Sequence, residues 1–406
     1  MKYIIINALL LAMLHAQAQD QPAFRRKSLP ECIEAALHNN LSLQVAGLDV
    51  REAETMQGTA FDVEKTSISY TRDPLTPDLT DKKVTVSQSV EFPTVYVSRS
   101  KTLNQETLLA ERARDITENE VIKDVSSAYY NLCHAEQLVG LLEWQDSIYA
   151  DFVTKANLRV KVGETNRLEL MNAQSLSQEI RLQIDQAKAV LTNCQLTMGK
   201  LLNTTDMLLP VESKPAKASD ESILLVENPT GEGSQQSIAA NPLIEYYEQQ
   251  LKVKQSQATT EINRLLPDIF GGYYFTDTKK PGFEIGIRLP LFFGAQTARV
   301  KAAKIKQTRV ELERRETERM LQNAYASQYG EYLLARRNLD YYEDKGVAQA
   351  DEILRVAQTS YGLGEIGYME YIRNLQSALE VKRKYFDALN RYNQSIITIN
   401  YLKGGN

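Results

Sequence analysis

The sequence is poor in the residues from which metal centres and aromatic ligand pockets are built. Its 406 residues include only 3 His, 3 Cys and 1 Trp. It has no phosphate-binding glycine loop, no paired-cysteine zinc spacing and no Gly-x-Ser-x-Gly elbow. Its 47 Lys and Arg against 52 Asp and Glu argue against a nucleic-acid-binding protein, which usually carries a basic face. We therefore expect no enzyme, no cofactor and no resident metal.

The N-terminus has the pattern of an export signal. Lys2 precedes an apolar run from Ile4 to Leu14, and the small-residue site Ala16-Gln17-Ala18 follows. This pattern is typical of a secretory signal peptide, which we place at residues 1–18. No later stretch reaches the roughly 18 consecutive apolar residues of a membrane helix. We expect an exported chain that no transmembrane helix holds in a bilayer.

Two long segments are almost free of Gly and Pro. Residues 97–162 contain only Gly140 as a breaker, and residues 295–361 contain only Gly330 and Gly346. Their apolar residues recur at spacings of three and four, which predicts two amphipathic helices of about 90–100 Å each at 1.5 Å per residue. A solvated coiled coil would show the same pattern.

The two segments belong to a tandem repeat. Each ends at a compact break, at Gly163 and at Gly364, and another helix follows each break. Glu169 and Glu370 are separated by the same interval along the chain as the two glycines. This shared offset predicts a signal peptide (1–18), a first repeat with a helix, two strands and a long helical hairpin (19–202), an irregular linker (203–240) and a second repeat (241–406).

Four segments alternate between polar and apolar residues, as strands do when their two faces meet different media. Residues 84–92 alternate except at Gln88, and residues 283–289 alternate throughout. Their expected partners are residues 66–72 and 268–276. We expect the lipid-facing side chains to include Val84, Val86, Val90, Phe92, Phe283, Ile285, Ile287 and Leu289.

Four such strands in one exported chain constrain the architecture. A soluble sandwich would lack a core, because almost all of the remaining chain is predicted to be helical. A barrel in lipid must close, and the smallest bacterial barrels have eight strands. Several chains must then pool their strands. We predict a mainly α fold with a β-barrel portion: long α-helical coiled-coil hairpins plus four membrane strands per chain, forming an α-barrel and β-barrel tube.

The chain resembles the outer-membrane efflux protein (TolC) family over essentially its whole mature length. The residues that carry the resemblance are 29–41 (LPECIEAALHNNL), 289–294 (LPLFFG) and the two breaks with their following helices. The resemblance implies a homotrimer with twelve strands in one outer-membrane barrel. It also implies a helical tunnel across the periplasm that docks on an inner-membrane pump through a periplasmic adaptor (membrane fusion) protein.

Residues 86–96 (VSQSVEFPTVY) resemble the branch that is paired with heavy-metal cation pumps of the resistance-nodulation-division (RND) class. This similarity implies export of metal cations or drugs. Two other functions stay open at this point. One is a periplasmic adaptor or coiled-coil scaffold, because long hairpins suit that role as well. The other is the exit duct of a type I protein secretion system.

The resemblance gives roles to residues at the two breaks. The adaptor-docking hairpin tips are Gly163, Glu164, Gly364, Glu365 and Gly367, although such glycines also simply cap helices. A periplasmic gate is assigned to Glu169, Tyr361, Glu370 and Arg373, where carboxylates from three chains would attract cations. Ile366 stands where a relative has a bonding Arg, and Arg373 stands where it has an acid. We therefore expect Arg373 to pair with Glu169 or Glu370; the alternative is that both acids are solvated helix positions.

Two of the cysteines could form a disulfide. Cys133 precedes Glu164 by nearly the same number of positions as Cys194 follows it. An antiparallel hairpin would place the two cysteines at nearly one height, so a disulfide is geometrically open. Two buried small apolar side chains would explain the same residues.

Overall fold

The computed structural model describes residues 24–76, 79–163, 166–211, 216–220, 223, 238–276, 281–289 and 293–405. The expected signal peptide (1–18), Glu164 and residues 290–292 of the family motif lie outside these ranges. The chain divides into two compact units. The first unit comprises Met1–Leu41, Asn119–Ser237 and Ala324–Asn406, and the second comprises Ser42–Glu118 and Ile238–Asn323. Each unit therefore combines parts of both sequence repeats.

The described chain is mainly helical, as predicted. Its helices are α2 (Leu29–Asn39), α3 (Leu41–Met56), α4 (Pro93–Lys161), α5 (Arg167–Leu202), α8 (Pro242–Asn263), α9 (Gly294–Tyr341), α10 (Val347–Gly362) and α11 (Tyr368–Lys403), with a 3₁₀ turn η1 (Gln57–Phe61) and a π turn η2 (Tyr342–Gly346). Its strands are β1 (Phe24–Lys27), β2 (Ser67–Thr76), β3 (Leu79–Val90), β4 (Met207–Pro210), β5 (Asp268–Thr276) and β6 (Pro281–Arg288). None of the helices in the described ranges has the length and apolar character needed to span a membrane.

The repeat seen in the sequence recurs in the geometry. Helices α5 and α11 have equal lengths, and they begin and end at matching positions of the two repeats. Each is capped by a residue in the left-handed region, Asn203 with φ 51° and Gly404 with φ 105°. Asn40 and Asn241 share nearly one backbone conformation, with φ −64° and ψ 127° against φ −68° and ψ 126°.

The second long segment is not one continuous α-helix, so that expectation was wrong. Helix α9 ends at Tyr341, the π turn η2 follows, and α10 begins at Val347. A Cβ at Gly346 would lie 2.9 Å from Cδ1 of Tyr342, so the turn is packed closely around a glycine. The first long segment, by contrast, is continuous from Pro93 to Lys161.

The linker expected to be irregular contains ordered structure. Strand β4 pairs in parallel with β1, from Phe24 opposite Met207 to Lys27 opposite Pro210. Residues 216–220 are held by side chains of α9 and α11. The Asn393 amide donates to the Ala216 carbonyl at 2.8 Å and accepts from the Ala218 N–H at 2.9 Å. Tyr332 donates its hydroxyl to Asp220 at 2.7 Å.

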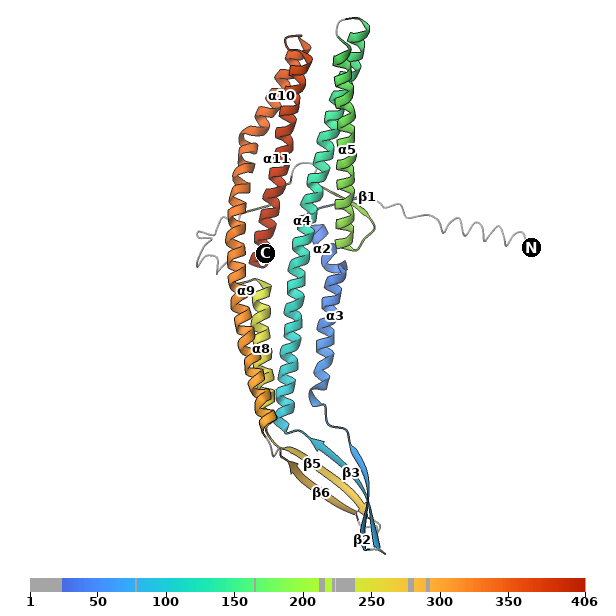
Figure 1. The fold of residues 1–406 in the computed structure, drawn as a ribbon, viewed down its shortest axis with the longest axis vertical. Helices are drawn as coiled ribbons and strands as arrows, with labels where there is room; N and C mark the ends of the chain where they lie inside the picture. The colour runs from blue at the N-terminus through green and yellow to red at the C-terminus, as the bar shows by residue number, and fades with distance from the viewer. Residues whose placement is uncertain are drawn as a thin grey trace, which may run out of the picture. The chain divides into compact units, whose positions relative to one another are not determined.

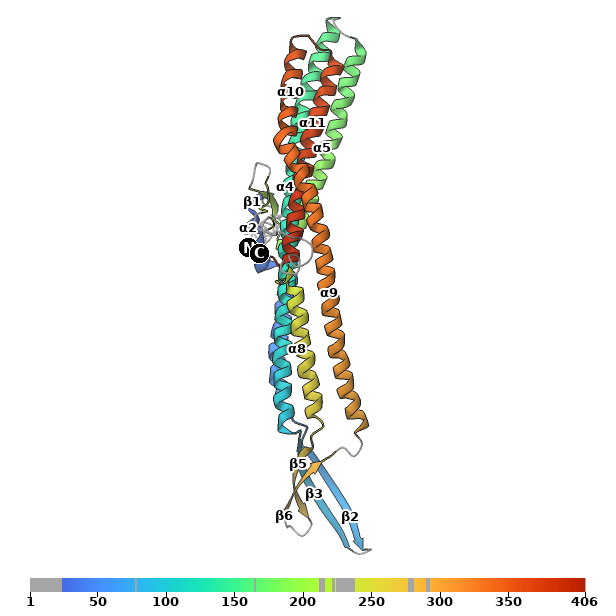
Figure 2. The ribbon, with the colours of Figure 1, turned by 90° about the vertical axis from the view of Figure 1, so that its left-hand side faces the viewer.

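In the first unit, α4 and α5 form one helical hairpin and α10 and α11 form another, and the two hairpins lie side by side (Figures 1 and 2). They share one hydrophobic cluster, described below. A second cluster joins α2, α4 and α5 and includes Cys32 and Cys133. None of the three cysteines forms a disulfide, and Cys194 donates to the Asn131 carbonyl at 3.9 Å. Cys32 and Cys133 are buried, Cys194 is half-buried, and this partial burial raises the pKa of the Cys194 thiol.

The second unit carries a four-stranded sheet. Its order is β2-β3-β5-β6, and every neighbouring pair is antiparallel. All four expected strands are present, with β3 and β6 ending at Val90 and Arg288 rather than at Phe92 and Leu289. Gln88, the residue that breaks the alternation, accepts a hydrogen bond from Thr66 at 2.7 Å and donates to the Glu64 carbonyl at 2.5 Å. Its side chain therefore fixes the segment that leads into β2.

Candidate functional site

The ends of the two hairpins turn at glycines in the left-handed region. Gly163 has φ +76° and Gly364 has φ +77°, and a Cβ at either would meet nothing within 4 Å. Glycine is favoured there by the backbone conformation and not by lack of space. Gly364, Glu365 and Gly367 are all exposed, and Gly367 is the N-cap residue of α11. The sequence alone indicated these turns correctly, and their role in adaptor docking stays a proposal.

The matched turns allow a clean test of this conformation. Replacing Gly364 by Ala is expected to cost about 1 kcal/mol, because a side chain destabilises the left-handed region. Gly362→Ala is the control, since Gly362 is the last residue of α10 and its φ is not positive. Thermal unfolding followed by circular dichroism measures both. A Gly364→Ala protein at least as stable as wild type would contradict the expectation.

Glu169 is held within its own hairpin. Its N–H donates to the Asn166 side chain at 3.0 Å, which caps the start of α5. Its carboxylate accepts a hydrogen bond from Arg159 of α4 at 3.3 Å, and only 16% of its side chain is exposed. Arg159 lies four residues before the turn glycine and Glu169 six residues after it, so an antiparallel alignment of the two helices would have indicated this pair.

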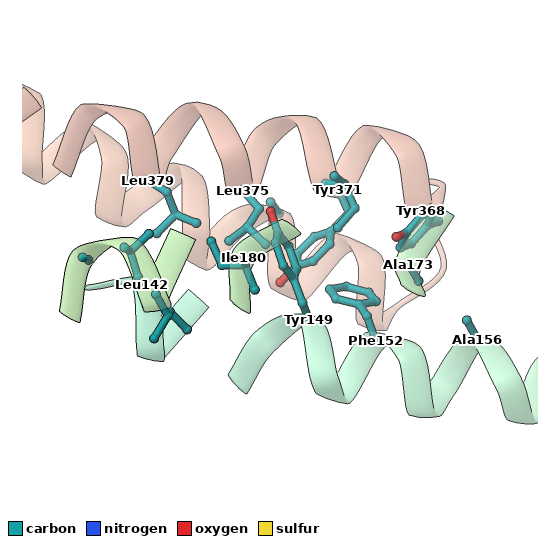
Figure 3. Close-up of a cluster of buried hydrophobic side chains, with 14 of the residues drawn as sticks. Leu142, Tyr149, Phe152, Ala156, Ala173, Ile180, Tyr368, Tyr371, Leu375 and Leu379 are labelled. Carbon is teal, nitrogen blue, oxygen red and sulfur yellow. The ribbon is translucent and has the colours of Figure 1, made fainter. Parts of the chain in front are cut away.

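An aromatic cluster joins the two hairpins beside Glu169. Phe152 of α4 lies 5.4 Å from Tyr361, 5.5 Å from Tyr368 and 4.9 Å from Tyr371, measured between ring centroids. Figure 3 shows Tyr149 and Phe152 pointing toward Tyr368 and Tyr371 of α11. Burial, reinforced by the charge of Glu169, raises the pKa of Tyr368 to about 12. Tyr368 is therefore neutral at physiological pH.

The four expected gate residues are in different environments. Glu169 is largely buried, and Tyr361 stacks on Tyr371 at 5.0 Å with 25° between the rings. Glu370 and Arg373 are exposed, and neither forms an ion pair with any described residue. The expected pairing of Arg373 with Glu169 or Glu370 is therefore not formed within one chain. Arg159, which the sequence analysis overlooked, is the cation at Glu169.

One face of the sheet in the second unit is apolar across all four strands. Directly opposed residues of an antiparallel sheet lie on one face, and Val86 lies opposite Ile68 on one side and Tyr273 on the other. Tyr273 in turn lies opposite Phe283. The same face carries Tyr70, Val84, Val90, Ile269, Phe275, Ile285 and Ile287. Phe283 and Ile285 are 80% and 81% exposed.

Six of the eight expected lipid-facing residues lie on this face, namely Val84, Val86, Val90, Phe283, Ile285 and Ile287. Phe92 and Leu289 follow the ends of β3 and β6, so they are not strand residues. The alternation of polar and apolar residues extends past the ends of β3 and β6, because this pattern does not mark the residue at which hydrogen bonding between strands stops.

The opposite face of the sheet is polar and carries two glycines covered by aromatic rings. Thr85, Ser87 and Ser89 alternate with the apolar residues of β3. A Cβ at Gly282 would lie 2.3 Å from Tyr274, and a Cβ at Gly286 would lie 2.5 Å from Phe270. The two rings therefore lie directly over backbone that has no side chain. A sheet with one exposed apolar face and one polar face suits a wall between lipid and water.

The chain is similar to known outer-membrane proteins, in part of its sequence and in its fold. The family model described as outer membrane efflux protein matches residues 233–405. No curated protein matches the sequence significantly. Among solved structures, CusC is similar with a TM-score of 0.74 and 18% identity, over 95% of this chain and 94% of that one. The Neisseria gonorrhoeae MtrE outer membrane channel in its open state is similar with a TM-score of 0.72 and 18% identity, over 93% and 89%.

The outer-membrane channel OprN is similar as well, with a TM-score of 0.76 and 15% identity, over 93% of this chain and 90% of that one. At these identities the likeness shows a shared fold. The family match covers the second repeat, and the shared fold covers nearly the whole chain. Residues 233–405 therefore match the outer membrane efflux protein family, and nearly the whole chain shares the fold of these solved outer-membrane channels.

Proposed function

We propose that the chain is one subunit of a homotrimeric exit duct in a tripartite efflux system. The observation that carries this proposal is the exposed apolar face that crosses all four strands of the sheet. Within the described residues, β2 and β6 are the edges of this sheet. Four strands cannot close a barrel in lipid, whereas three copies supply twelve strands and leave no open edge.

The partners we propose are a periplasmic adaptor protein and an inner-membrane RND pump. The exposed turn at Gly364, Glu365 and Gly367 supports the adaptor, because a docking surface must be accessible at the hairpin end. The similarity of residues 86–96 to the metal-cation branch supports export of metal cations or drugs. A duct takes its selectivity largely from its pump, and no chemical step is required of this chain.

Sensitivity assays test the proposed function and its substrate class together. Cells lacking the protein are expected to become more sensitive to metal cations or drugs, and the wild-type chain is expected to restore growth. Loss of one secreted protein without any change in sensitivity would assign the chain to type I secretion instead. Recovery as a freely soluble periplasmic protein, without detergent, would indicate an adaptor or scaffold.

The gate gives a second test, by electrical recording. Glu169→Ala, Glu370→Ala and Tyr361→Phe are each expected to raise single-channel conductance in planar bilayers, and the two alanine variants are also expected to weaken cation preference. Tyr361→Phe should act least, because its ring contacts with Phe152 and Tyr371 are kept.

Glu380→Ala is the matched control for this test. Glu380 is also a carboxylate of α11, and it pairs with Arg383 of its own helix at 3.2 Å, away from the hairpin end. Its removal is expected to leave the current unchanged. Currents like wild type in all three gate variants would place the constriction elsewhere in the channel.

A further inference from the structure

A groove in the second unit collects positive charge from three helices. It has a volume of about 430 Å³ and is bounded by α4, α8 and α9. Five basic side chains line it, against two acidic ones, and Glu91 pairs with two of the five basic residues, which leaves an excess of two positive charges. The basic residues are Arg99, Lys254, Arg264, Arg299 and Lys306, and the acidic residues are Glu106 and Glu261.

Two of the three arginines, Arg99 and Arg264, are already held in place by carboxylates. Arg99 pairs with Glu91, and Arg264 reaches the same carboxylate at 3.6 Å. Arg264 also pairs with Glu261 of its own helix at 2.7 Å. On the next turns, Lys254 donates to the Gln257 side chain at 3.3 Å, and Gln257 donates to Glu106 at 2.8 Å. These bonds fix one wall of the groove.

The two basic residues that α9 contributes to the groove, Arg299 and Lys306, have no carboxylate partner among the described residues. Arg299, Ala302, Ala303 and Lys306 recur at helical spacing, so they form one stripe with two small residues between two cations. Neither Arg299 nor Lys306 forms an ion pair with a described residue. Residues 294–309 hold five basic residues and no acidic one. Of these, Arg309 pairs with Glu313 at 3.2 Å, whereas the charges of Arg299 and Lys306 are available to an anion.

The groove lies where the helices meet the sheet. Arg99 is six residues into α4 and Arg299 five residues into α9, which places both within about 10 Å of their helix starts. Arg264 directly follows α8, and β5 begins at Asp268. Figures 1 and 2 show α4, α8 and α9 ending at the level where the sheet begins. If the sheet lies in lipid, as the proposed function requires, these cations lie at the level of the lipid headgroups.

We propose that this groove is a binding site for a phosphate group, supplied by the headgroup of an anionic lipid. Arginine donates to phosphate in a fixed fork, and lysine adds a compact charge on a flexible stem. Clusters of such residues beside a membrane bind anionic headgroups. The two alanines of α9 leave room for the phosphate between Arg299 and Lys306.

Native mass spectrometry of the full-length protein in detergent tests the site, with phosphatidylglycerol, phosphatidylcholine and inorganic phosphate as probes. Wild-type protein is expected to retain phosphatidylglycerol in preference to phosphatidylcholine. Arg299→Gln with Lys306→Gln is expected to weaken phosphatidylglycerol binding about ten- to thirty-fold. Lys301→Gln with Lys304→Gln removes equal charge from the same helix, outside the groove, and is expected to bind within about twofold of wild type.

The outcomes distinguish a lipid headgroup from a soluble phosphate compound as the source of the phosphate. They also distinguish failure of the binding site from failure of the proposed trimeric duct. Binding of inorganic phosphate, but not of phosphatidylglycerol, with the same dependence on Arg299 and Lys306 would support the site and assign it to a soluble phosphate compound. Equal loss in both double variants, or loss in neither, would overturn the site. The same spectra report the number of subunits, so a trimer that fails to bind lipid leaves the proposed function standing.

Discussion

Phe152→Ala is expected to lower the free energy of unfolding by about 3–5 kcal/mol, the largest effect we expect from one substitution in the helical hairpins. Phe152 is 4% exposed and contacts Tyr361, Tyr368 and Tyr371 of the second hairpin. Its removal leaves a cavity lined by three rings, at the point where the two hairpins are joined. Thermal unfolding of the detergent-solubilised protein, followed by circular dichroism, measures the loss.

Trp144→Ala is the control for this substitution. Trp144 is an aromatic residue of the same helix, but it is 42% exposed, and the Nζ of Lys382 lies 5.4 Å from its ring centroid. We expect its removal to cost about 1 kcal/mol or less, because an exposed cation–π contact is weak. Equal losses in the two variants would show that the aromatic cluster does not hold the hairpins together.

Val86→Arg is expected to cost about 2–4 kcal/mol of folding free energy in a bilayer, because Val86 lies within the row of apolar residues that crosses all four strands. Arginine on a lipid-facing position must take its charge into hydrocarbon. Folding into vesicles over a denaturant series measures this cost.

Ser69→Arg is the matched control for the sheet. Ser69 is an exposed residue that lies opposite Thr85, on the polar face. Arginine there is expected to fold as well as wild type, because the side chain stays in water. If Val86→Arg folds equally well, the apolar face does not contact lipid.

Periodicity predicted most of the architecture, for physical reasons that are visible in the sequence. A helix that buries one stripe needs apolar residues at spacings of three and four, and α4 shows this spacing along its length. A strand between two media needs alternation, and β3 and β6 show it. The turn glycines Gly163 and Gly364 could be placed because only glycine adopts a positive φ without strain.

The features that the sequence did not predict depend on contacts between distant segments. Strand β1 is short, and its partner β4 comes from a segment near the middle of the chain. The π turn η2 contains residues such as Glu343 and Lys345 that continue an α-helix equally well, so its geometry comes from packing around Gly346. The aromatic cluster needs Phe152 from one repeat and Tyr371 from the other, which periodicity within one helix cannot connect.

The residues at the hairpin ends could be predicted only in part, because their surroundings also depend on contacts between separate helices. Glu169 was singled out by its offset from Glu370, and the structure gives the two acids different surroundings. Arg159 is the residue that makes the difference, because it reaches Glu169 across the turn at 3.3 Å. At the matching position of the second repeat the chain has Ser360, which cannot supply a charge.

The number of subunits in the detergent-solubilised protein tests the central claim most directly. Each chain contributes a sheet of four strands with an apolar face, so a closed barrel requires several copies. Native mass spectrometry, combined with conductance recordings on the same preparation, is expected to show three copies of the chain and a cation-preferring channel. A stable monomer that conducts ions across a bilayer would contradict the account, because four strands would then form a pore without partners.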